Sequence, residues 1–203
     1  MIRMALTKGR LEDKTVERFA QAGYDVQMVR DKGRKLILPV GSELQLVLAK
    51  APDVLTYVER GVCDAGVVGK DTIMEYGGTY YEVADLGFGQ CRFALAVPAG
   101  VDFYAGYQTK RIASKYPKVA KEYFARKGMD VEIIQIEGSV ELAPLVGLVD
   151  GIVDIVETGT TLKENGLVVC EYIADLSARL IVNTASMKLK KQALEEIIAA
   201  ISQ

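Results

Sequence analysis

The sequence predicts an α/β fold in which helices cover both faces of the sheets. Along the whole chain of 203 residues, short apolar runs of strand length alternate with segments whose apolar residues recur at helical spacing. Half of the residues are hydrophobic and 26% are charged, which is typical of a folded, soluble protein. A chain of this length forms one large domain or two small ones around a substantial core.

The first half of the chain alternates regularly between the two kinds of segment. Ile2–Leu6 is an apolar run of strand length, and Arg10–Gln21 has helical spacing with Gly23 as its stop signal. Pro52 suits the first turn of a helix that extends to about Arg60. Further strands are predicted at Val26–Val29, Leu36–Leu38, Leu44–Leu48 and Ala65–Val68, and a further helix at Lys70–Tyr76.

The second half continues the same alternation. Val131–Ile136 alternates apolar with charged residues, as a half-buried strand does, and Met187–Ile201 carries the apolar stripe of an amphipathic helix. The other predicted strands are Phe93–Val97, Arg111–Ala113, Ile152–Val156, Leu167–Val169 and Leu180–Val182. The other predicted helices are Tyr116–Arg126, Val140–Val146 and Leu162–Asn165.

Composition excludes several classes of function. The chain has no histidine, so triad hydrolases, zinc hydrolases and enzymes with a histidine general base are excluded. Three widely spaced cysteines argue against a disulfide framework and against a zinc site. A net charge of −2 disfavours a general nucleic-acid binder, although local clusters of Lys and Arg can still bind a small polyanion. No apolar run approaches the roughly 20 residues of a membrane span, and we expect a cytoplasmic protein.

The most informative stretch is Asp150–Gly166, DGIVDIVETGTTLKENG. An apolar strand that contains Asp154 opens into the turn Glu157–Thr161, and a helix follows. Such a turn presents backbone N–H groups and hydroxyls to an anion at the positive end of a helix dipole. The carboxylates of Asp154 and Glu157 beside it suit a ribose diol or a hydrated magnesium ion. An ordinary strand–turn–helix with threonine caps explains the spacing of this stretch equally well.

A second stretch, Gly61–Gly69, resembles Gly151–Gly159 in its order of Asp, apolar strand and glycine turn. Unless the similarity is chance, it predicts two similar lobes that close on a small anionic ligand at the carboxyl ends of their strands. Two classes fit this picture: a periplasmic-type binding protein, and a transferase acting on phosphorylated substrates. Acidic residues in the anion turn favour the transferase, because a passive anion receptor gains nothing from carboxylates there.

Cations stand where several other strands begin or end. Lys8 and Arg10 follow the first strand and open a helix, Lys50 ends another strand, and Arg92 precedes a third. Because cations at a helix N-terminus oppose the dipole, phosphate binding explains Lys8 and Arg10 better than simple solvation does. Ser139 follows a strand as the expected N-cap of a helix with Glu141 in its first turn, and capping alone can account for it.

Six motifs follow one another between Met4 and about Met187: TKGR, GVCDAGVVGKD, DLGFGQCR, IASKYP, GSVELAPLVGLVD and DIVETGTTLKENGL. In this order they resemble the catalytic subunit of the ATP phosphoribosyltransferase family, and the length matches its short form, which lacks a C-terminal regulatory domain. The resemblance implies two α/β lobes like those of type II periplasmic binding proteins, with a ligand cleft between them. Lobe I would comprise residues 1–88 with 179–203, and lobe II residues 89–178, including the phosphoribosyl pyrophosphate loop.

The resemblance also implies a reaction, the first step of histidine biosynthesis. N1 of ATP joins C1 of 5-phosphoribosyl pyrophosphate, giving N1-(5-phosphoribosyl)-ATP and pyrophosphate. This chemistry needs no histidine, because the adenine lone pair is free at neutral pH. Cationic side chains and Mg²⁺, carried with phosphoribosyl pyrophosphate, can stabilise the charge that grows on the leaving group. The alternative function is a non-catalytic, two-lobed module that binds or senses small anions.

Matching the motifs residue by residue assigns roles to side chains, with no metal ligand among them. The implied catalytic residues are Lys50, Arg34 and Arg10. The implied substrate-binding residues are Lys8, Gly9, Arg92, Ser139, Glu141, Asp154, Glu157, Thr158, Gly159, Thr160 and Thr161. Related chains commonly carry Arg where this one has Lys50, and an uncharged residue where it has Glu137. Lysine keeps the charge but lacks the bidentate fork of arginine.

The resemblance further implies an assembly. Arg34 lies in a segment that reaches toward the neighbouring subunit's site in this family, which implies a homodimer. The short form works with a regulatory subunit similar to histidyl-tRNA synthetase, in a hetero-octamer. No nucleic acid or membrane partner is implied.

Overall fold

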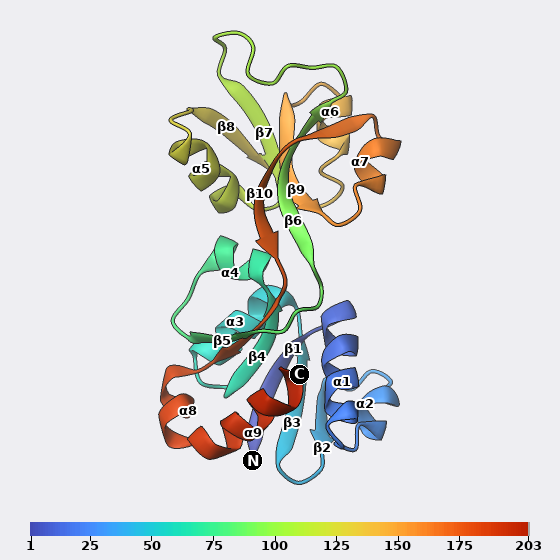
Figure 1. The fold of residues 1–203 in the computed structure, drawn as a ribbon, viewed down its shortest axis with the longest axis vertical. Helices are drawn as coiled ribbons and strands as arrows, with labels where there is room; N and C mark the ends of the chain where they lie inside the picture. Colours follow the sequence, from blue (N-terminus) through green and yellow to red (C-terminus); the bar gives the residue numbers. More distant parts are fainter. Residues whose placement is uncertain (203) are drawn as a thin grey trace. The chain divides into compact units, whose positions relative to one another are not determined.

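The computed structural model describes residues 1–202, and the chain divides into two compact α/β units. Unit 1 comprises Met1–Gly89 together with the C-terminal segment from Ser177, and unit 2 comprises Gln90–Leu176. The sequence analysis placed the two crossings after residues 88 and 178. Each unit contains one mixed sheet with helices on both of its faces (Figure 1).

The sheet of unit 1 has the strand order β2-β3-β1-β4-β11-β5. Its strands are β1 (Ile2–Thr7), β2 (Ile37–Val40), β3 (Leu44–Ala49), β4 (Ala65–Gly69), β5 (Tyr81–Asp85) and β11 (Ala178–Val182). β1 runs parallel to both β3 and β4, whereas β2 and β11 are antiparallel to their neighbours. The carboxyl ends of β1, β3 and β4 therefore meet at one edge, and the segment that leads into β2 lies there too.

Two groups of helices enclose this sheet. The helices of unit 1 are α1 (Arg10–Gln21), α2 (Gln27–Arg30), α3 (Ala51–Glu59), α4 (Lys70–Tyr76), α8 (Thr184–Leu189) and α9 (Lys191–Ile201). On one face, α1 and α9 bury Phe19 and Leu194, and on the other face α3 buries Val54 and Val58. Gly66 of β4 permits the approach of α3, because a Cβ at Gly66 would lie 2.7 Å from Cγ1 of Val54.

The sheet of unit 2 has the order β10-β6-β9-β7-β8. Its strands are β6 (Cys91–Pro98), β7 (Lys110–Ser114), β8 (Val131–Gln135), β9 (Gly151–Val156) and β10 (Leu167–Leu176), and its helices are α5 (Pro117–Arg126), α6 (Leu142–Leu145) and α7 (Thr160–Glu164). α5 covers one face and α6 and α7 the other. β7 is parallel to β8 and β9, while β6 is antiparallel to β9. The carboxyl ends of β7, β8 and β9 thus share an edge with the beginning of β6.

In unit 1, one predicted strand is a helical turn in the structure, and one observed strand had not been predicted. The strand predicted at Val26–Val29 is wrong, because Gln27–Arg30 forms a single helical turn, α2. Asp25 starts this turn by accepting a hydrogen bond from the N–H of Gln27 at 3.0 Å. A short apolar run does not distinguish a helical turn from a strand. β5 had no prediction, since its five residues are exposed or half-buried and show no alternation.

Two predicted helices are shorter or broken. The helix predicted at Val140–Val146 is confined to Leu142–Leu145, so Ser139 is not its N-cap; Glu141 holds that position and caps no N–H with its side chain. The single helix predicted at Met187–Ile201 is divided at Lys190 into α8 and α9. The Nζ of Lys190 donates to the carboxylate of Asp64 at 2.9 Å. This tertiary contact lies where the local apolar pattern predicted a continuous helix.

Asp64 joins three segments of unit 1. Its buried carboxylate accepts hydrogen bonds from the backbone N–H of Arg3 at 2.9 Å and from Oγ of Ser186 at 2.7 Å, besides that of Lys190. Burial acts to raise the pKa of Asp64, but these donors outweigh it and leave the pKa below its usual value. Asp64 precedes β4, whereas Asp154 lies inside β9. The two stretches that resemble each other in sequence therefore place their aspartates differently, and Asp64 has a structural role.

We predict that Asp64→Asn lowers the free energy of unfolding at pH 7 by roughly 1–2 kcal/mol, because one amide oxygen cannot replace a carboxylate that accepts from three donors. A carboxyl whose pKa is lowered on folding contributes stability above its unfolded pKa and loses it as the pH falls. The difference in the free energy of unfolding between the wild type and Asp64→Asn, measured by urea unfolding, should therefore shrink as the pH falls from 5 to 3. The exposed Asp130→Asn serves as control, and an equal loss in both variants would contradict the role of Asp64.

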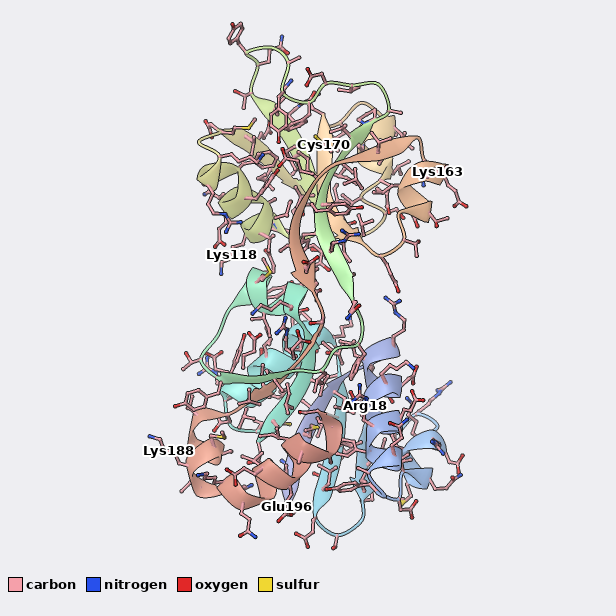
Figure 2. All side chains as sticks on the ribbon, in the orientation of Figure 1. Arg18, Lys118, Lys163, Cys170, Lys188 and Glu196 are labelled. Carbon is pink, nitrogen blue, oxygen red and sulfur yellow. The ribbon has the colours of Figure 1, made fainter. Side chains whose placement is uncertain are left out.

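All three cysteines are free thiols. Cys63 is buried in unit 1, and burial raises its pKa to about 11. Cys91 lies at the start of β6, and Cys170 lies on β10 (Figure 2). None of the helices within residues 1–202 is long and apolar enough to cross a bilayer.

Candidate functional site

In unit 1, cations gather where the parallel strands end. The turn after β1 is fixed against β3, because the N–H of Lys8 donates to the carbonyl of Ala49 at 3.0 Å. Lys50 follows β3 directly, at the N-cap position of α3, and Arg10 begins α1. Lys8, Arg10 and Lys50 are all exposed. The parallel pairing of β1 and β3 therefore brings together cations that are about 40 residues apart in the sequence.

A pocket of about 430 Å³ lies beside this turn. Its lining comes from the turn after β1, the first turn of α1, the segment before β2 and the end of β3. The lining residues are Lys8, Gly9, Glu12, Lys32, Gly33, Arg34, Lys35, Leu36 and Leu48. Four cations and a single carboxylate line it, which suits a polyanionic ligand. We call it the cationic pocket.

The cationic pocket unites some of the residues assigned from the sequence and omits others. Lys8, Gly9 and Arg34 line it together, whereas Arg10 and Lys50 are not among its lining residues. Lys32 and Lys35 are additions that the sequence analysis missed. The basic run DKGRKL at residues 31–36 was the available signal, but its proximity to Lys8 depends on the pairing of β2 with β3.

Gly9 shapes the turn. Its φ of 93° lies in a region that L-residues with a side chain rarely adopt, and it is the N-cap residue of α1. Because glycine carries no side chain, the backbone of this turn stays open to a ligand. The backbone N–H of Gly9 donates to Oε2 of Glu12 at 3.4 Å.

In unit 2, the turn Glu157–Thr161 follows β9 directly. Gly159 has a left-handed φ of 77° and is the N-cap residue of the short helix α7. Oγ1 of Thr158 lies 3.0 Å from Oγ1 of Thr160 and 3.4 Å from its N–H. Glu157, Thr158, Thr160 and Thr161 are exposed. The two hydroxyls thus lie close together in an exposed turn at the start of a helix, and an anion could bind there.

Asp154 differs from these exposed residues because it is half-buried within β9. Burial raises its pKa to about 6; the negative charge of Glu141 acts in the same direction, while the N–H of Ile155 and the charge of Lys115 oppose it. Lys115 follows β7, in a turn that Ser114 fixes by donating to the carbonyl of Val153 at 2.6 Å. Asp154, Glu141 and Lys115 therefore interact electrostatically, although they come from three separate segments.

Arg92 stands at the same edge of unit 2. It pairs in register with Val156, the last residue of β9, and its guanidinium lies 3.7 Å from the ring centroid of Tyr172. At this distance the cation stacks on the ring, which restricts the exposed guanidinium without neutralising it. Ser139 is exposed in the segment before α6, ahead of Glu141. Tyr172 is a neighbour that the sequence analysis did not identify.

The described residues contain no group of three or more Cys, Asp or Glu side chains placed to hold a metal ion. Asp154 and Glu157 are still hard oxygen donors of the kind that Mg²⁺ prefers.

Comparison with known proteins identifies the family. The model of the family described as ATP phosphoribosyltransferase, HisG, matches residues 50–203. An ATP phosphoribosyltransferase of Clostridium kluyveri is 60% identical over 198 residues, which cover 97% of this chain and 90% of the relative. One of Clostridium novyi is 55% identical over 205 residues, covering 100% of this chain and 97% of the relative.

Solved structures agree in fold. The chain matches a structure of the ATP phosphoribosyl transferase (HisG:HisZ) complex from Thermotoga maritima with a TM-score of 0.85 and 33% identity, covering 99% of this chain and 96% of that one. The periplasmic aliphatic sulphonate binding protein SsuA of Escherichia coli has a TM-score of 0.62 at 12% identity, covering 98% and 70% of the two chains, and shares the fold alone. High identity over nearly the whole length decides between enzyme and sensor module: the chain belongs to the ATP phosphoribosyltransferase family, glycosyltransferases of histidine biosynthesis.

Proposed function

We propose that the chain joins ATP to 5-phosphoribosyl pyrophosphate, and that each unit has its own set of binding residues for this reaction. The observation that carries this proposal is that two acidic residues flank the exposed threonine turn in unit 2. Asp154 and Glu157 flank the threonine turn, and a sugar phosphate presents both hydroxyls and a phosphate. A simple phosphate receptor would not need the acids.

Unit 2 binds the phosphoribosyl group in this proposal. Thr158, Gly159, Thr160 and Thr161 hold the 5-phosphate through N–H groups and hydroxyls, and the two acids accept hydrogen bonds from the ribose hydroxyls. Arg92, Ser139 and Glu141 contribute to the same edge. Such contacts orient C1 of the ribose toward the incoming base, and orientation is a large part of catalysis when two substrates must meet.

Unit 1 contributes cations for the pyrophosphate and for the phosphates of ATP. Lys8 and Gly9 from the turn after β1, with Arg10, Arg34 and Lys50, are the groups assigned to this task. The clustering of Lys8 and Arg34 in the cationic pocket supports the assignment. Positive groups that face the leaving group act most strongly when negative charge accumulates on it.

The reaction needs no base from the protein, because one bond forms at C1 of the ribose as another breaks. The lone pair of adenine N1 forms the bond to C1, the bond from C1 to the pyrophosphate oxygen breaks, and its electrons leave with pyrophosphate. Mg²⁺ carried with phosphoribosyl pyrophosphate would supply further charge neutralisation. The role of the protein is therefore to position and orient the two substrates and to neutralise the charge on pyrophosphate. A chain that has no histidine can do this.

We further propose an assembly. Arg34 is exposed on the segment before β2, from which it could reach the site of a second copy in a homodimer. A regulatory subunit of the HisZ type is proposed from the HisG:HisZ complex of the Thermotoga maritima relative, and its assembly into a hetero-octamer is proposed from the family resemblance alone. The cytoplasmic location stays a prediction.

The test is direct. The purified full chain is incubated with ATP, 5-phosphoribosyl pyrophosphate and MgCl₂, and both pyrophosphate release and the mass of the nucleotide product are measured. We expect one pyrophosphate for each ATP adduct, and neither product when any one component is left out. Binding of both substrates without an adduct at micromolar enzyme would contradict the proposal and favour a sensor.

A further inference from the structure

Glu12 is an unusual component of the cationic pocket. It is the pocket's one carboxylate among the lining residues, and its side chain is only 4% exposed. A carboxylate near bound phosphate repels it, so its presence there requires another explanation. Glu12 lies in the first turn of α1, where a negative charge suits the helix dipole, but an exposed position would serve that purpose as well.

The contacts of Glu12 provide the explanation. Oε1 forms an ion pair with Nζ of Lys32, and Oε2 accepts the hydrogen bond from the N–H of Gly9. One carboxylate thus joins the turn that carries Lys8 to the segment that carries Lys32 and Arg34. Both segments line the cationic pocket, and β1 and β2 are not neighbours in the sheet. The Glu12 carboxylate is thus a side-chain link between these two parts of the lining.

The ion pair between Glu12 and Lys32 also lines a second pocket. Glu12 and Lys32 also line a neighbouring pocket of about 420 Å³, together with Asp13, Val16, Glu17, Val29 and Arg30. That second pocket has a mixed and more acidic lining. The pair therefore borders both pockets, and any shift of Glu12 alters the shape of both.

We propose that Glu12 is a positioning residue, which holds the Lys8–Gly9 turn and the Lys32–Arg34 segment at the spacing that binds a pyrophosphate group. The proposal rests on the function proposed above for the cationic pocket. In it Glu12 does not touch the substrate. It acts through Gly9 and Lys32, and its charge is compensated by Lys32.

Glu12→Asp is the decisive variant, because it keeps the charge but shortens the side chain by one methylene, so that the carboxylate cannot reach both partners. We expect the Kd for inorganic pyrophosphate, measured by titration calorimetry on the full chain, to rise about threefold to tenfold, as expected for the loss of one hydrogen bond. KM for 5-phosphoribosyl pyrophosphate should rise by the same factor, with kcat changed less than twofold. Glu17→Asp, on the same helix and exposed, is the matched control and should leave both constants unchanged.

Glu12→Gln separates positioning from charge. If Glu12 acted only through its negative charge, its removal would tighten pyrophosphate binding; positioning predicts weaker binding for this variant as well. Wild-type affinity in Glu12→Asp, tighter binding in Glu12→Gln, or a loss of thermal stability with unchanged affinity would each overturn the proposal. A wild-type chain that binds pyrophosphate but forms no ATP adduct would contradict the proposed function and leave this binding test intact.

Discussion

Asp154→Asn should make the protein more stable at neutral pH and far less active. Burial raises the pKa of Asp154 to about 6, so at pH 7 the folded protein carries an ionised carboxylate in a place that disfavours the charge. An asparagine of the same shape removes this cost. We expect a gain in the free energy of unfolding of about 2 kcal/mol at pH 7, a discounted value because the side chain is only partly buried.

The pH dependence follows from the direction of the shift. A carboxyl with a higher pKa in the folded state binds more protons when folded, so the wild-type protein loses stability as the pH rises from about 4 to about 6. The variant has no such group. The difference between the two proteins in urea unfolding should therefore be near zero at pH 4 and complete above pH 6.

Activity should change in the opposite direction. In the proposed mechanism the Asp154 carboxylate accepts hydrogen bonds from ribose hydroxyls, and a hydrogen bond to a charged group contributes about 1.5–3 kcal/mol. The value of kcat/KM for 5-phosphoribosyl pyrophosphate should fall about 10- to 100-fold. Asp150→Asn is the control: Asp150 binds the N–H of Arg111 at 2.7 Å, just before β9 begins, and its loss should affect stability only. A variant at Asp154 with wild-type kinetics would remove this residue from the site.

Thr160→Val should raise KM for 5-phosphoribosyl pyrophosphate about 10- to 100-fold while kcat and stability stay close to those of the wild type. The reason is the loss of a hydroxyl that donates to a charged phosphate, an interaction of about 1.5–3 kcal/mol. Stability should change little because Thr160 is exposed, and its hydroxyl contacts only that of Thr158 among the hydrogen bonds described. Initial rates at varied substrate concentration, with thermal unfolding in parallel, provide the measurement.

The matched control is Thr109→Val. Thr109 is exposed just before β7, at the edge of the unit 2 sheet opposite the proposed site. Thr109→Val therefore makes the same chemical change as Thr160→Val but removes no contact with the phosphate. If Thr160→Val lowers thermal stability and leaves KM unchanged, the hydroxyl of Thr160 serves the turn and not the ligand.

The sequence by itself determined the elements whose signals are local. α1 and α4 begin and end where the apolar spacing predicted, and the strand–turn–helix around Thr158 was visible in the order of residues. The family motifs are contiguous stretches, and they predicted a membership that identities of 55–60% confirm. Each of these features depends on neighbours within a few turns of the chain, so the pattern alone was sufficient.

Tertiary structure decided what depends on residues far apart in the chain. Whether Val26–Val29 is a strand depends on a partner strand it does not have, and the break at Lys190 coincides with a contact to Asp64, 126 positions away. The raised pKa of Asp154 needs the burial of β9, and the cationic pocket needs β2 beside β3. In the sequence, Glu12 is an ordinary charged residue of a helix, and only the fold shows that it is buried in contact with Gly9 and Lys32. Desolvation and charge pairing act through space, and the order of residues specifies them only once the chain has folded.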